Sequence, residues 1–289
     1  MRLVVTGAGG MLGRDVVRVA CGAGHDVTAL ARTQLDITDA DATTEAVVQA
    51  APDVVMNCAA WTDVDAAEAQ EAAALAVNGT GAGNVAGAAA LAGAAIVHVS
   101  TDYVFDGTKR TPYVESDPTG PIGAYGRTKL AGEQAVAAAG GRHAIVRTAW
   151  LFGLGGPNFV DTMLRLGRER DEVSVVTDQI GCPTWTGHLA GALVSIAERG
   201  TTGILHGAGS GSCSWFAFAR EIFDLAGVAC TVNATTTEAF PRPAPRPAWS
   251  VLATERIDAP TLPPWREGLS GYLAEREAAE TTATNGARA

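Results

Sequence analysis

The sequence predicts an α/β fold: a doubly wound parallel sheet followed by a smaller C-terminal region. Short apolar runs of strand length alternate with helix-length segments over residues 1–150, and a glycine-rich turn follows the first of these runs. Of the 289 residues, 47% are hydrophobic and 18% are charged, which is enough apolar material for a large core. At roughly 150 residues per domain, the length also fits about two domains.

The elements of the first half follow one another as strand and helix. Residues 2–6 form a buried-strand pattern, and an amphipathic segment extends from the glycine turn to about Cys21. Parallel strands need crossover helices between them, so this alternation indicates βαβ units. We expect residues 1–150 to form the first domain, and its further strand-like runs are residues 26–31, 53–57, 95–100 and 143–147.

The pattern changes after residue 150. A strand-like run near residues 203–207 is expected to join the sheet of the first domain. Residues 241–264 are dense in proline, which fixes φ and lacks an N–H donor, so this segment should be irregular. Residues 275–289 are rich in Ala, Thr and Glu without an apolar period and are expected to be a disordered tail. Helices are expected at residues 158–170, 184–199 and 214–226.

Charge and cysteine content exclude several classes of protein. Lys and Arg number 21 and Asp and Glu number 31, giving a net charge of −10. We expect no nucleic-acid partner, because that affinity comes mostly from cations on phosphates. No segment has the pattern of a signal peptide or a membrane span, so no membrane partner is expected. The five scattered cysteines form no C-x-x-C pair, which favours a cytoplasmic location, and no residue cluster has metal-ligand spacing.

A glycine motif, G-x-x-G-x-x-G, begins directly after the first strand at Gly7, Gly10 and Gly13. Glycine is needed in such a turn because the backbone must approach a pyrophosphate without a Cβ in the way. The helix that follows offers its free N–H groups to the anion. A plain strand–helix turn is the alternative. The position after an N-terminal strand favours a Rossmann-type dinucleotide-binding fold.

The end of the second strand bears on the choice of cofactor. An acid there binds the ribose hydroxyls of NAD, whereas a basic residue accommodates the 2′-phosphate of NADP. The strand ends in Ala29-Leu30-Ala31-Arg32 and has no acid. Arg32 therefore favours NADPH, with NADH possible and an ordinary surface arginine as the alternative.

Tyr125 and Lys129 stand four residues apart, so on a helix they share one face. An ammonium beside a phenol should lower the phenol pKa from about 10, so that Tyr125 could exchange a proton with a carbonyl or alcohol oxygen. A helix-surface pair is the alternative. Thr101 follows a strand-like run, and α/β sheets bind ligands where their strands end. The sequence predicts one catalytic site containing Thr101, Tyr125 and Lys129.

Further motifs make the chain resemble the extended short-chain dehydrogenases/reductases and, among them, the dTDP-4-dehydrorhamnose reductase family. The glycine motif and Tyr-x-x-x-Lys are common to the superfamily. The more specific matches run in the family's order over about 250 residues. They are NCAAWTDVD at residues 57–65, STDYVFDG at 100–107, RTAW at 147–150, DQIGCPT at 178–184 and RPAWSVL at 246–252.

The resemblance implies a role for each matching residue. Residues 1–150 would form an NAD(P)-binding Rossmann domain and residues 151–274 mainly a substrate-binding region. Tyr125 would be the proton donor, and Lys129 would hold the nicotinamide ribose. The expected cofactor-binding residues are Gly7, Gly10, Met11, Leu12, Gly13, Arg32, Asp36, Ile37, Ala59, Ala60, Trp61, Tyr125 and Lys129; those expected at the dTDP-sugar are Thr101, Asp102, Tyr103, Trp150, Gln179, Arg242 and Arg246.

Three positions depart from the family pattern. Trp61 stands where the family usually has Tyr or His, and Ala149 stands where it usually has Ser. The nicotinamide and sugar pocket is therefore expected to differ from that of the family. Some dimeric relatives bridge subunits through Mg²⁺ held by glutamates, and one of those positions is Gly187 here. We expect no bound metal, and either a monomer or a homodimer.

Four other residues are interpreted as structural. Cys182 lies in the expected substrate loop and is interpreted as a small apolar residue, not a nucleophile. His98 and His206 fall in apolar strand-like runs and are interpreted as core or near-core groups. Trp215 begins an expected helix and is interpreted as part of its apolar face.

The function implied by the resemblance is reduction of the C4 ketone of dTDP-4-dehydrorhamnose to dTDP-L-rhamnose with NADPH. Three alternatives remain open: a reductase of another dTDP-4-keto-6-deoxyhexose, a sugar 4,6-dehydratase and a non-catalytic NADP-binding subunit. Trp61 and Ala149 keep the first open. Tyr103 disfavours the dehydratase, which has an acid at that position, and Tyr125 disfavours the subunit, which needs no proton donor.

Overall fold

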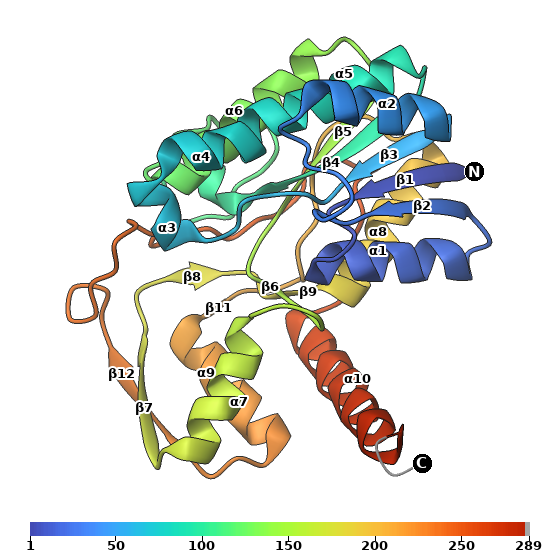
Figure 1. The fold of residues 1–289 in the computed structure, drawn as a ribbon. Coiled ribbons are helices and arrows are strands. Elements are labelled where there is room, and N and C mark those ends of the chain that lie inside the picture. The colour runs from blue at the N-terminus through green and yellow to red at the C-terminus, as the bar shows by residue number, and fades with distance from the viewer. Residues whose placement is uncertain (287–289) are drawn as a thin grey trace.

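The computed structural model describes residues 1–286 of the chain, with side chains through Thr281. At its centre is a six-stranded sheet with the strand order β10-β5-β4-β3-β1-β2, in which every neighbouring pair is parallel (Figure 1). The run near residues 203–207 joins this sheet as its edge strand. The strands are β1 (Arg2–Thr6), β2 (Asp26–Leu30), β3 (Val54–Asn57), β4 (Ala95–Thr101), β5 (His143–Thr148) and β10 (Gly203–His206).

Helices cover both faces of the sheet (Figure 1). Along β1, Leu3 and Val5 pack into one apolar cluster and Val4 into the other, because successive side chains of a strand point to opposite faces. Burial on both faces explains why the strands appear as continuous apolar runs. The predicted doubly wound α/β fold is confirmed. Helices α1 (Met11–Gly22) and α8 (Thr186–Arg199) cover one face; α2 (Ala40–Ala50), α5 (Ala82–Leu91) and α6 (Ala124–Ala138) cover the other.

Between β3 and α5 the chain forms two short helices, α3 (Val64–Ala69) and α4 (Glu71–Leu75). A π-helical segment, η1 (Ala76–Gly81), then leads directly into α5. Segments of π-helix are rare and frequently occur at functional sites. This one carries Asn78, whose side chain bonds the loop that follows β3.

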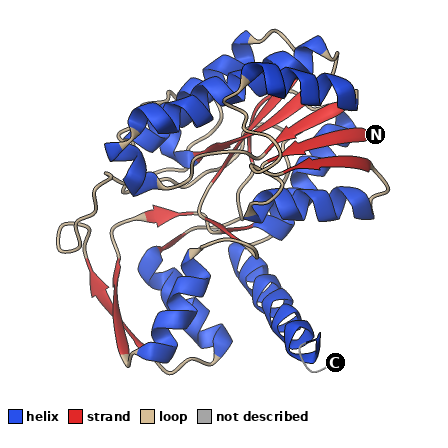
Figure 2. Ribbon diagram, in the orientation of Figure 1, coloured by secondary structure: helices blue, strands red, loops and turns tan. Residues whose placement is uncertain are grey.

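The C-terminal region packs below the sheet as a smaller unit (Figure 1). Helices α7 (Phe159–Glu169) and α9 (Trp215–Ala226) enclose an aromatic cluster that includes Phe152 and Phe218. Figure 2 shows that the strands here form short pairs apart from the central sheet. The pairs are β6 (Leu151–Phe152) with β9 (Thr184–Trp185), β8 (Ile180–Gly181) with β11 (Cys213–Ser214), and β7 (Glu172–Val176) with β12 (Thr231–Thr235).

The last helix, α10 (Trp265–Gly286), corrects the expectation of a disordered tail from residue 275. Ala, Glu and Arg are strong helix formers, so this run continues the helix without an apolar period. It is also anchored, because the Tyr272 hydroxyl and Arg276 Nε donate to the Asp161 carboxylate at 2.8 and 2.9 Å. Residues 287–289, which the same expectation covered, lie outside the described residues.

Candidate active site

Within residues 1–150, the predicted site residues lie in or beside the loops at one edge of the sheet. The glycine loop follows β1, the loop of residues 58–61 follows β3, and Thr101 ends β4. Since the strands are parallel, their carboxyl ends meet at this edge. The strand β1 lies between β2 and β3, where the strand order reverses. Open α/β sheets bind their ligands at such a point.

The glycine loop is closely packed. Gly7 has φ +68°, and a Cβ there would lie 2.6 Å from the Ala59 nitrogen. A Cβ on Gly13 would lie 2.2 Å from the Gly7 carbonyl oxygen. Gly10 is the N-cap of α1 and supplies no side chain to the N–H groups of the first turn, where Met11 and Leu12 lie. The loop thus presents unblocked backbone donors, which is the chemistry that binds a phosphate.

The segment after β2 lies at the surface. Arg32 and Asp36 are exposed, and Ile37 is buried beneath Asn84, whose Nδ2 donates to the Ile37 carbonyl at 2.9 Å. Hydrogen bonds from the Thr38 backbone and hydroxyl lower the pKa of Asp36. The strand β2 ends at Leu30, and no carboxylate stands between Leu30 and Arg32.

The loop after β3 is held by an amide that sequence reasoning missed. Asn78 Oδ1 accepts the Trp61 N–H at 2.8 Å, and Asn78 Nδ2 donates to the Trp61 carbonyl at 3.1 Å. The same Nδ2 reaches the Thr128 hydroxyl on α6 at 3.1 Å. Asn78 therefore ties Trp61, at the end of this loop, to the helix that carries Tyr125. The π-helical turn at residue 78 is invisible to a search for helical periodicity.

Thr101 and Tyr125 meet at the end of β4. The Thr101 hydroxyl donates to Asp102 Oδ1 at 3.0 Å and accepts the Tyr103 N–H at 3.2 Å. Burial raises the pKa of Tyr125 to about 12, although a hydrogen bond between Thr101 and Tyr125 acts to lower it. The expected lowering of the Tyr125 pKa by Lys129 is therefore wrong: burial is the larger effect. A phenol in this state holds its proton at neutral pH.

Lys129 is buried on the face of α6 that packs on the sheet. Its Nζ donates to the Val99 carbonyl at 2.7 Å and lies 3.5 Å from His98 Nε2. Burial lowers the pKa of Lys129 to about 8, although Glu133 and Cys58 act to raise it. The prediction that Tyr125 and Lys129 share one helix face at the site of Thr101 agrees with this geometry.

Asp102 and Tyr103 lie in the short 3₁₀ turn η2 (Asp102–Val104) that follows Thr101. Asp102 is 2% exposed, and burial raises the pKa of its carboxyl to about 7. The Tyr103 ring meets the Tyr125 ring edge to face, with centroids 5.8 Å apart. Both residues therefore lie beside Tyr125.

Trp150 follows β5 and has φ +48°, a conformation that a bulky residue adopts at a cost. Its ring stacks on the Trp215 ring with centroids 3.5 Å apart. On Gly181 a Cβ would lie 2.4 Å from Trp150 Cε2, so the indole ring is held between that glycine and Trp215. Trp215 packs against the apolar cluster of the C-terminal region, which agrees with the prediction that it is part of the apolar face of its helix.

Arg242 and Arg246 both bind Asp65, the second residue of α3. Arg242 Nε donates to Oδ2 at 3.0 Å, and Arg246 Nη1 donates to Oδ1 at 2.9 Å. The Ala244 N–H donates to Oδ1 as well, at 3.1 Å. Burial acts to raise the pKa of Asp65, but hydrogen bonds from the two arginines hold it far below its usual range. We call Asp65 with residues 242–246 the Asp65 clasp.

Two further residues position the site. Gln179 is buried, and its Nε2 donates to the Thr237 hydroxyl at 2.9 Å. Glu68, which the sequence analysis missed, accepts the Ala124 N–H at 2.7 Å and so caps α6, the helix of Tyr125. Since Asp65 and Glu68 lie on the same short helix, α3 connects the clasp to the start of α6.

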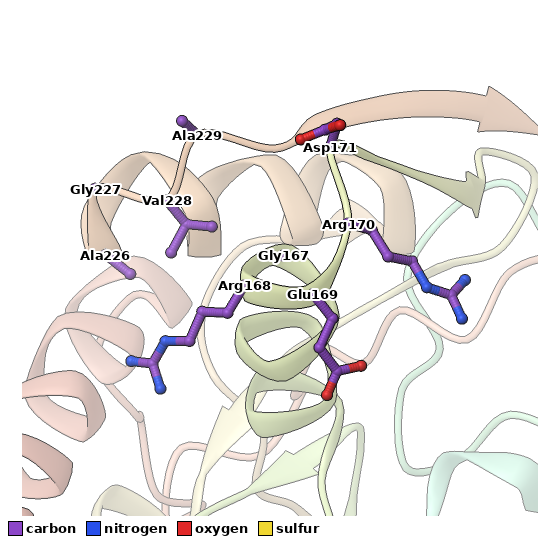
Figure 3. Close-up of a pocket in the computed structure, with 9 residues that line it drawn as sticks. All are labelled: Gly167, Arg168, Glu169, Arg170, Asp171, Ala226, Gly227, Val228 and Ala229. Carbon is purple, nitrogen blue, oxygen red and sulfur yellow. The ribbon is translucent and has the colours of Figure 1, made fainter.

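A surface hollow of about 580 Å³ lies away from this edge of the sheet, at the ends of α7 and α9 (Figure 3). It is lined by residues 167–171 and 226–229 and includes none of the predicted site residues. Within the described residues, no three His, Cys, Asp or Glu side chains gather as a metal site would require. Over the same part of the chain, no helix has the length and apolar character of a membrane span.

The glycine cradle at the point where the strand order reverses, with Tyr125 and Lys129 on one helix beside Thr101, defines a Rossmann-type oxidoreductase. Comparison with known proteins gives the particular group. The chain belongs to the family whose model is described as RmlD substrate binding domain, which matches residues 1–278.

Individual relatives agree with the family. The chain is 48% identical over 280 residues to a dTDP-4-dehydrorhamnose reductase of Mycolicibacterium smegmatis, covering 94% of this chain and 85% of that one. It is 44% identical to a probable dTDP-4,6-dihydroxy-2-methyloxan-3-one 4-ketoreductase of Streptomyces antibioticus, covering 97% of each chain. A dTDP-4-dehydrorhamnose reductase of Bacillus anthracis, solved in complex with NADP, is 39% identical, with a TM-score of 0.92 and coverage of 95% and 99%.

Proposed function

We propose that this chain is an NADPH-dependent reductase that converts the C4 ketone of dTDP-4-dehydrorhamnose to the alcohol of dTDP-L-rhamnose. The observation that carries the proposal is the meeting of Thr101, Tyr125 and Lys129 beside the glycine cradle, in a chain 48% identical to a reductase of that name. The alternative of a 4,6-dehydratase lacks such a relative among those described above.

The residues present fit a dinucleotide. The Gly7 and Gly13 positions leave no space for a Cβ, and the first turn of α1 has free N–H groups for a pyrophosphate. Arg32 would meet the 2′-phosphate, Asp36 and Ile37 the adenosine end, and residues 59–61 the nicotinamide. Lys129 would bind the nicotinamide ribose. When bound, the nicotinamide supplies the hydride that the protein itself cannot.

The protein's own residues supply the proton and the alignment. Tyr125 holds its proton at neutral pH and donates it to the C4 oxygen as that oxygen gains negative charge. The Thr101 hydroxyl steadies the same oxygen, and Asp102, Tyr103 and Trp150 border the sugar. Gln179, Arg242 and Arg246 would recognise the nucleotide, since the guanidinium fork binds two phosphate oxygens at once. All five cysteines are free, which supports a cytoplasmic place of action.

The test is NADPH oxidation with dTDP-4-keto-6-deoxyglucose in the presence and absence of a 3,5-epimerase. Turnover that requires the epimerase and yields dTDP-L-rhamnose is the expected result. Turnover without the epimerase would assign the chain to a different dTDP-keto sugar. NADPH binding without any turnover would remove the reductase proposal and favour the non-catalytic subunit.

Reduction of another dTDP-4-keto-6-deoxy sugar is the second candidate. Two observations favour it: the 44% identity to the Streptomyces antibioticus ketoreductase and the unusual Trp61 and Ala149. Trp61 is fixed by Asn78 and by the hydrogen bond from its Nε1 to the Asp63 carbonyl at 3.0 Å. Its ring therefore holds a defined position in the loop that would meet the nicotinamide. Comparing kcat/KM for several keto sugars separates the two candidates.

A further inference from the structure

His98 is a buried titratable group that the proposed mechanism does not use. It lies on β4 with 0% exposure, and its ring is next to Lys129. In the register of the sheet, Thr6 pairs with Asn57 and Asn57 pairs with His98. Residues paired across parallel strands point to the same face, so three side chains form one polar row across β1, β3 and β4.

The row has a defined direction. A backbone N–H can only donate, so the Asn57 atom that meets the Ala59 N–H at 3.2 Å is the carbonyl oxygen Oδ1. The Thr6 hydroxyl donates to this oxygen at 2.7 Å. Asn57 Nδ2 therefore faces the other way and donates to His98 Nδ1 at 3.0 Å.

The tautomer of His98 follows from this bond. A ring nitrogen that accepts a hydrogen bond carries no proton, so the neutral imidazole has its proton on Nε2. That N–H faces Lys129 Nζ at 3.5 Å. Burial and the Lys129 charge hold the pKa of His98 well below its usual range, in agreement with a neutral ring.

We propose that His98 is a positioning residue for Lys129: its Nε2–H, oriented by Asn57, meets the lysine amine and disfavours the ammonium form. This inference rests on the proposed function, in which Lys129 holds the nicotinamide ribose one helical turn from Tyr125. The Val99 carbonyl fixes Nζ from β4 at 2.7 Å. The amine is therefore confined between the sheet and α6, and its charge depends on the groups around it.

Two other titratable groups face Lys129. Cys58 follows β3, and Glu133 lies one turn further along α6; both favour the ammonium form. Arg147 donates to both Glu133 oxygens at 2.9 and 2.7 Å, and the Ser100 hydroxyl also donates to this carboxylate, so much of its charge is neutralised. Burial has the opposite effect and lowers the pKa of Lys129. The His98 N–H acts in the same direction as burial, because it presents a positive dipole end to the amine.

The sequence makes the charge of Lys129 directly measurable, because the chain has two lysines, Lys109 and Lys129. Labelling lysine with ¹³C at Cε gives two signals, which a Lys109→Arg variant assigns. The titration of the Lys129 signal reports its charge in the full chain without substrate, and the Lys109 signal is an internal reference.

The variant is His98→Gln, which replaces the N–H by an amide that can turn its oxygen toward Lys129. We expect the Lys129 titration to move up by about one pH unit. The matched control is His206→Gln, a buried histidine on β10 whose Nδ1 bonds the Ala253 carbonyl and which lies two strands away from β4. This control should leave Lys129 unchanged. An equal titration in His98→Gln and wild type would overturn the proposal.

A second measurement uses the wild-type protein, so it does not depend on whether a variant with a substitution in the core folds. Long-range ¹H–¹⁵N spectra of the wild type report the tautomer of each histidine, and His98 is expected as the neutral Nε2–H form from pH 6 to 8. A proton on Nδ1 would overturn the proposal. Neither measurement uses a sugar substrate. If both agree with the inference but no keto sugar is reduced, the positioning of Lys129 stands and the reductase proposal falls.

Discussion

The two sides of the site are held together by different kinds of interaction. On the sheet side, Asn57, His98 and Lys129 are buried and bond one another or the backbone. On the C-terminal side, the Arg242 side chain is 51% exposed in its pair with Asp65, whereas Arg246 and Asp65 are each 17% exposed. Leaving a buried polar group unpaired is costly, whereas exposed ion pairs exchange partners readily. We infer that proton and cofactor chemistry has a fixed geometry here, while nucleotide recognition is adjustable.

The largest expected effect comes from removing the proton donor on the fixed side. Tyr125→Phe should lower kcat by about 10²- to 10⁴-fold, because the phenol is the group proposed to transfer its proton to the ketone oxygen. NADPH affinity should change little, since the glycine loop, Arg32 and Lys129 would still hold the dinucleotide. Turnover and NADPH fluorescence titrations give the two values. A loss in kcat below tenfold would show that another group donates the proton.

Gly7→Ala tests whether the glycine cradle is as closely fitted as the contacts indicate. The added Cβ would lie 2.6 Å from the Ala59 nitrogen, at φ +68°. Gly24 is a matched control, because it has φ +81° but a Cβ there would have no neighbouring atom within 4 Å. Gly24→Ala should cost about 1–2 kcal/mol from backbone conformation alone.

For Gly7→Ala we expect the free energy of unfolding to fall by about a further 1–3 kcal/mol, because of the contact with the Ala59 nitrogen. We also expect NADPH binding to weaken by about tenfold or more. Chemical denaturation and NADPH titration measure both. Equal stability of the two variants would mean that the loop after β3 moves freely, and the sheet side would then not be the rigid half of the site.

Asp102→Asn tests how far the buried carboxyl lowers the stability of the folded protein. Burial raises its pKa from 3.8 to about 7, so the folded state keeps a proton that the unfolded state releases between those values. The stability of the wild type should therefore fall as pH rises from 4 to 7. The asparagine removes this dependence and still accepts from Thr101. At pH 8 we expect it to stabilise the protein by about 1–3 kcal/mol. A pH dependence of unfolding unchanged by the substitution would contradict the burial argument.

The sheet side was predictable from the sequence because its patterns are local. The alternation of strands and helices, the glycine motif, the i to i+4 pair and Thr101 each follow from periodicity or from a short spacing. What could not be predicted is what depends on contacts across strands. His98 was interpreted only as a core group, since nothing in its apolar run shows that the strand register places Asn57 beside it. The predicted lowering of the Tyr125 pKa was wrong for the same reason, because the burial of a side chain depends on the whole fold.

The C-terminal side was less predictable. Its strands are two to five residues long and pair with distant segments, so no period identifies them. The two arginines were found from the family motif, but their partner was not. Asp65 lies 177 positions from Arg242, in a helix of six residues. The expected disordered tail was wrong because one anchored face, at Tyr272 and Arg276, is enough to continue a helix of strong helix formers.

The smallest expected effect lies on this adjustable side, at the Asp65 clasp. Asp65→Asn keeps one acceptor oxygen but removes the charge that holds the two guanidinium groups. If the clasp holds them in place for the diphosphate, KM for the dTDP-sugar should rise about 3- to 10-fold with a smaller change in kcat, because preorganisation of a binding group affects ground state and transition state alike. If Asp65 instead competes with the phosphates for the arginines, KM should fall.

Glu71→Gln is the matched control for this substitution. It removes a more exposed carboxylate–arginine pair, to Arg127 at 2.8 Å, from the neighbouring helix α4, to which the mechanism assigns no residue. Neither KM nor kcat should change, since a pair this exposed contributes about 1 kcal/mol or less to stability. We expect KM to rise in Asp65→Asn, to return to the wild-type value in Asp65→Glu and to stay unchanged in the control. These results would locate nucleotide recognition in residues 242–246. An unchanged KM would mean that the clasp only closes the fold, and the contrast between a fixed and an adjustable half would then rest on the sheet side alone.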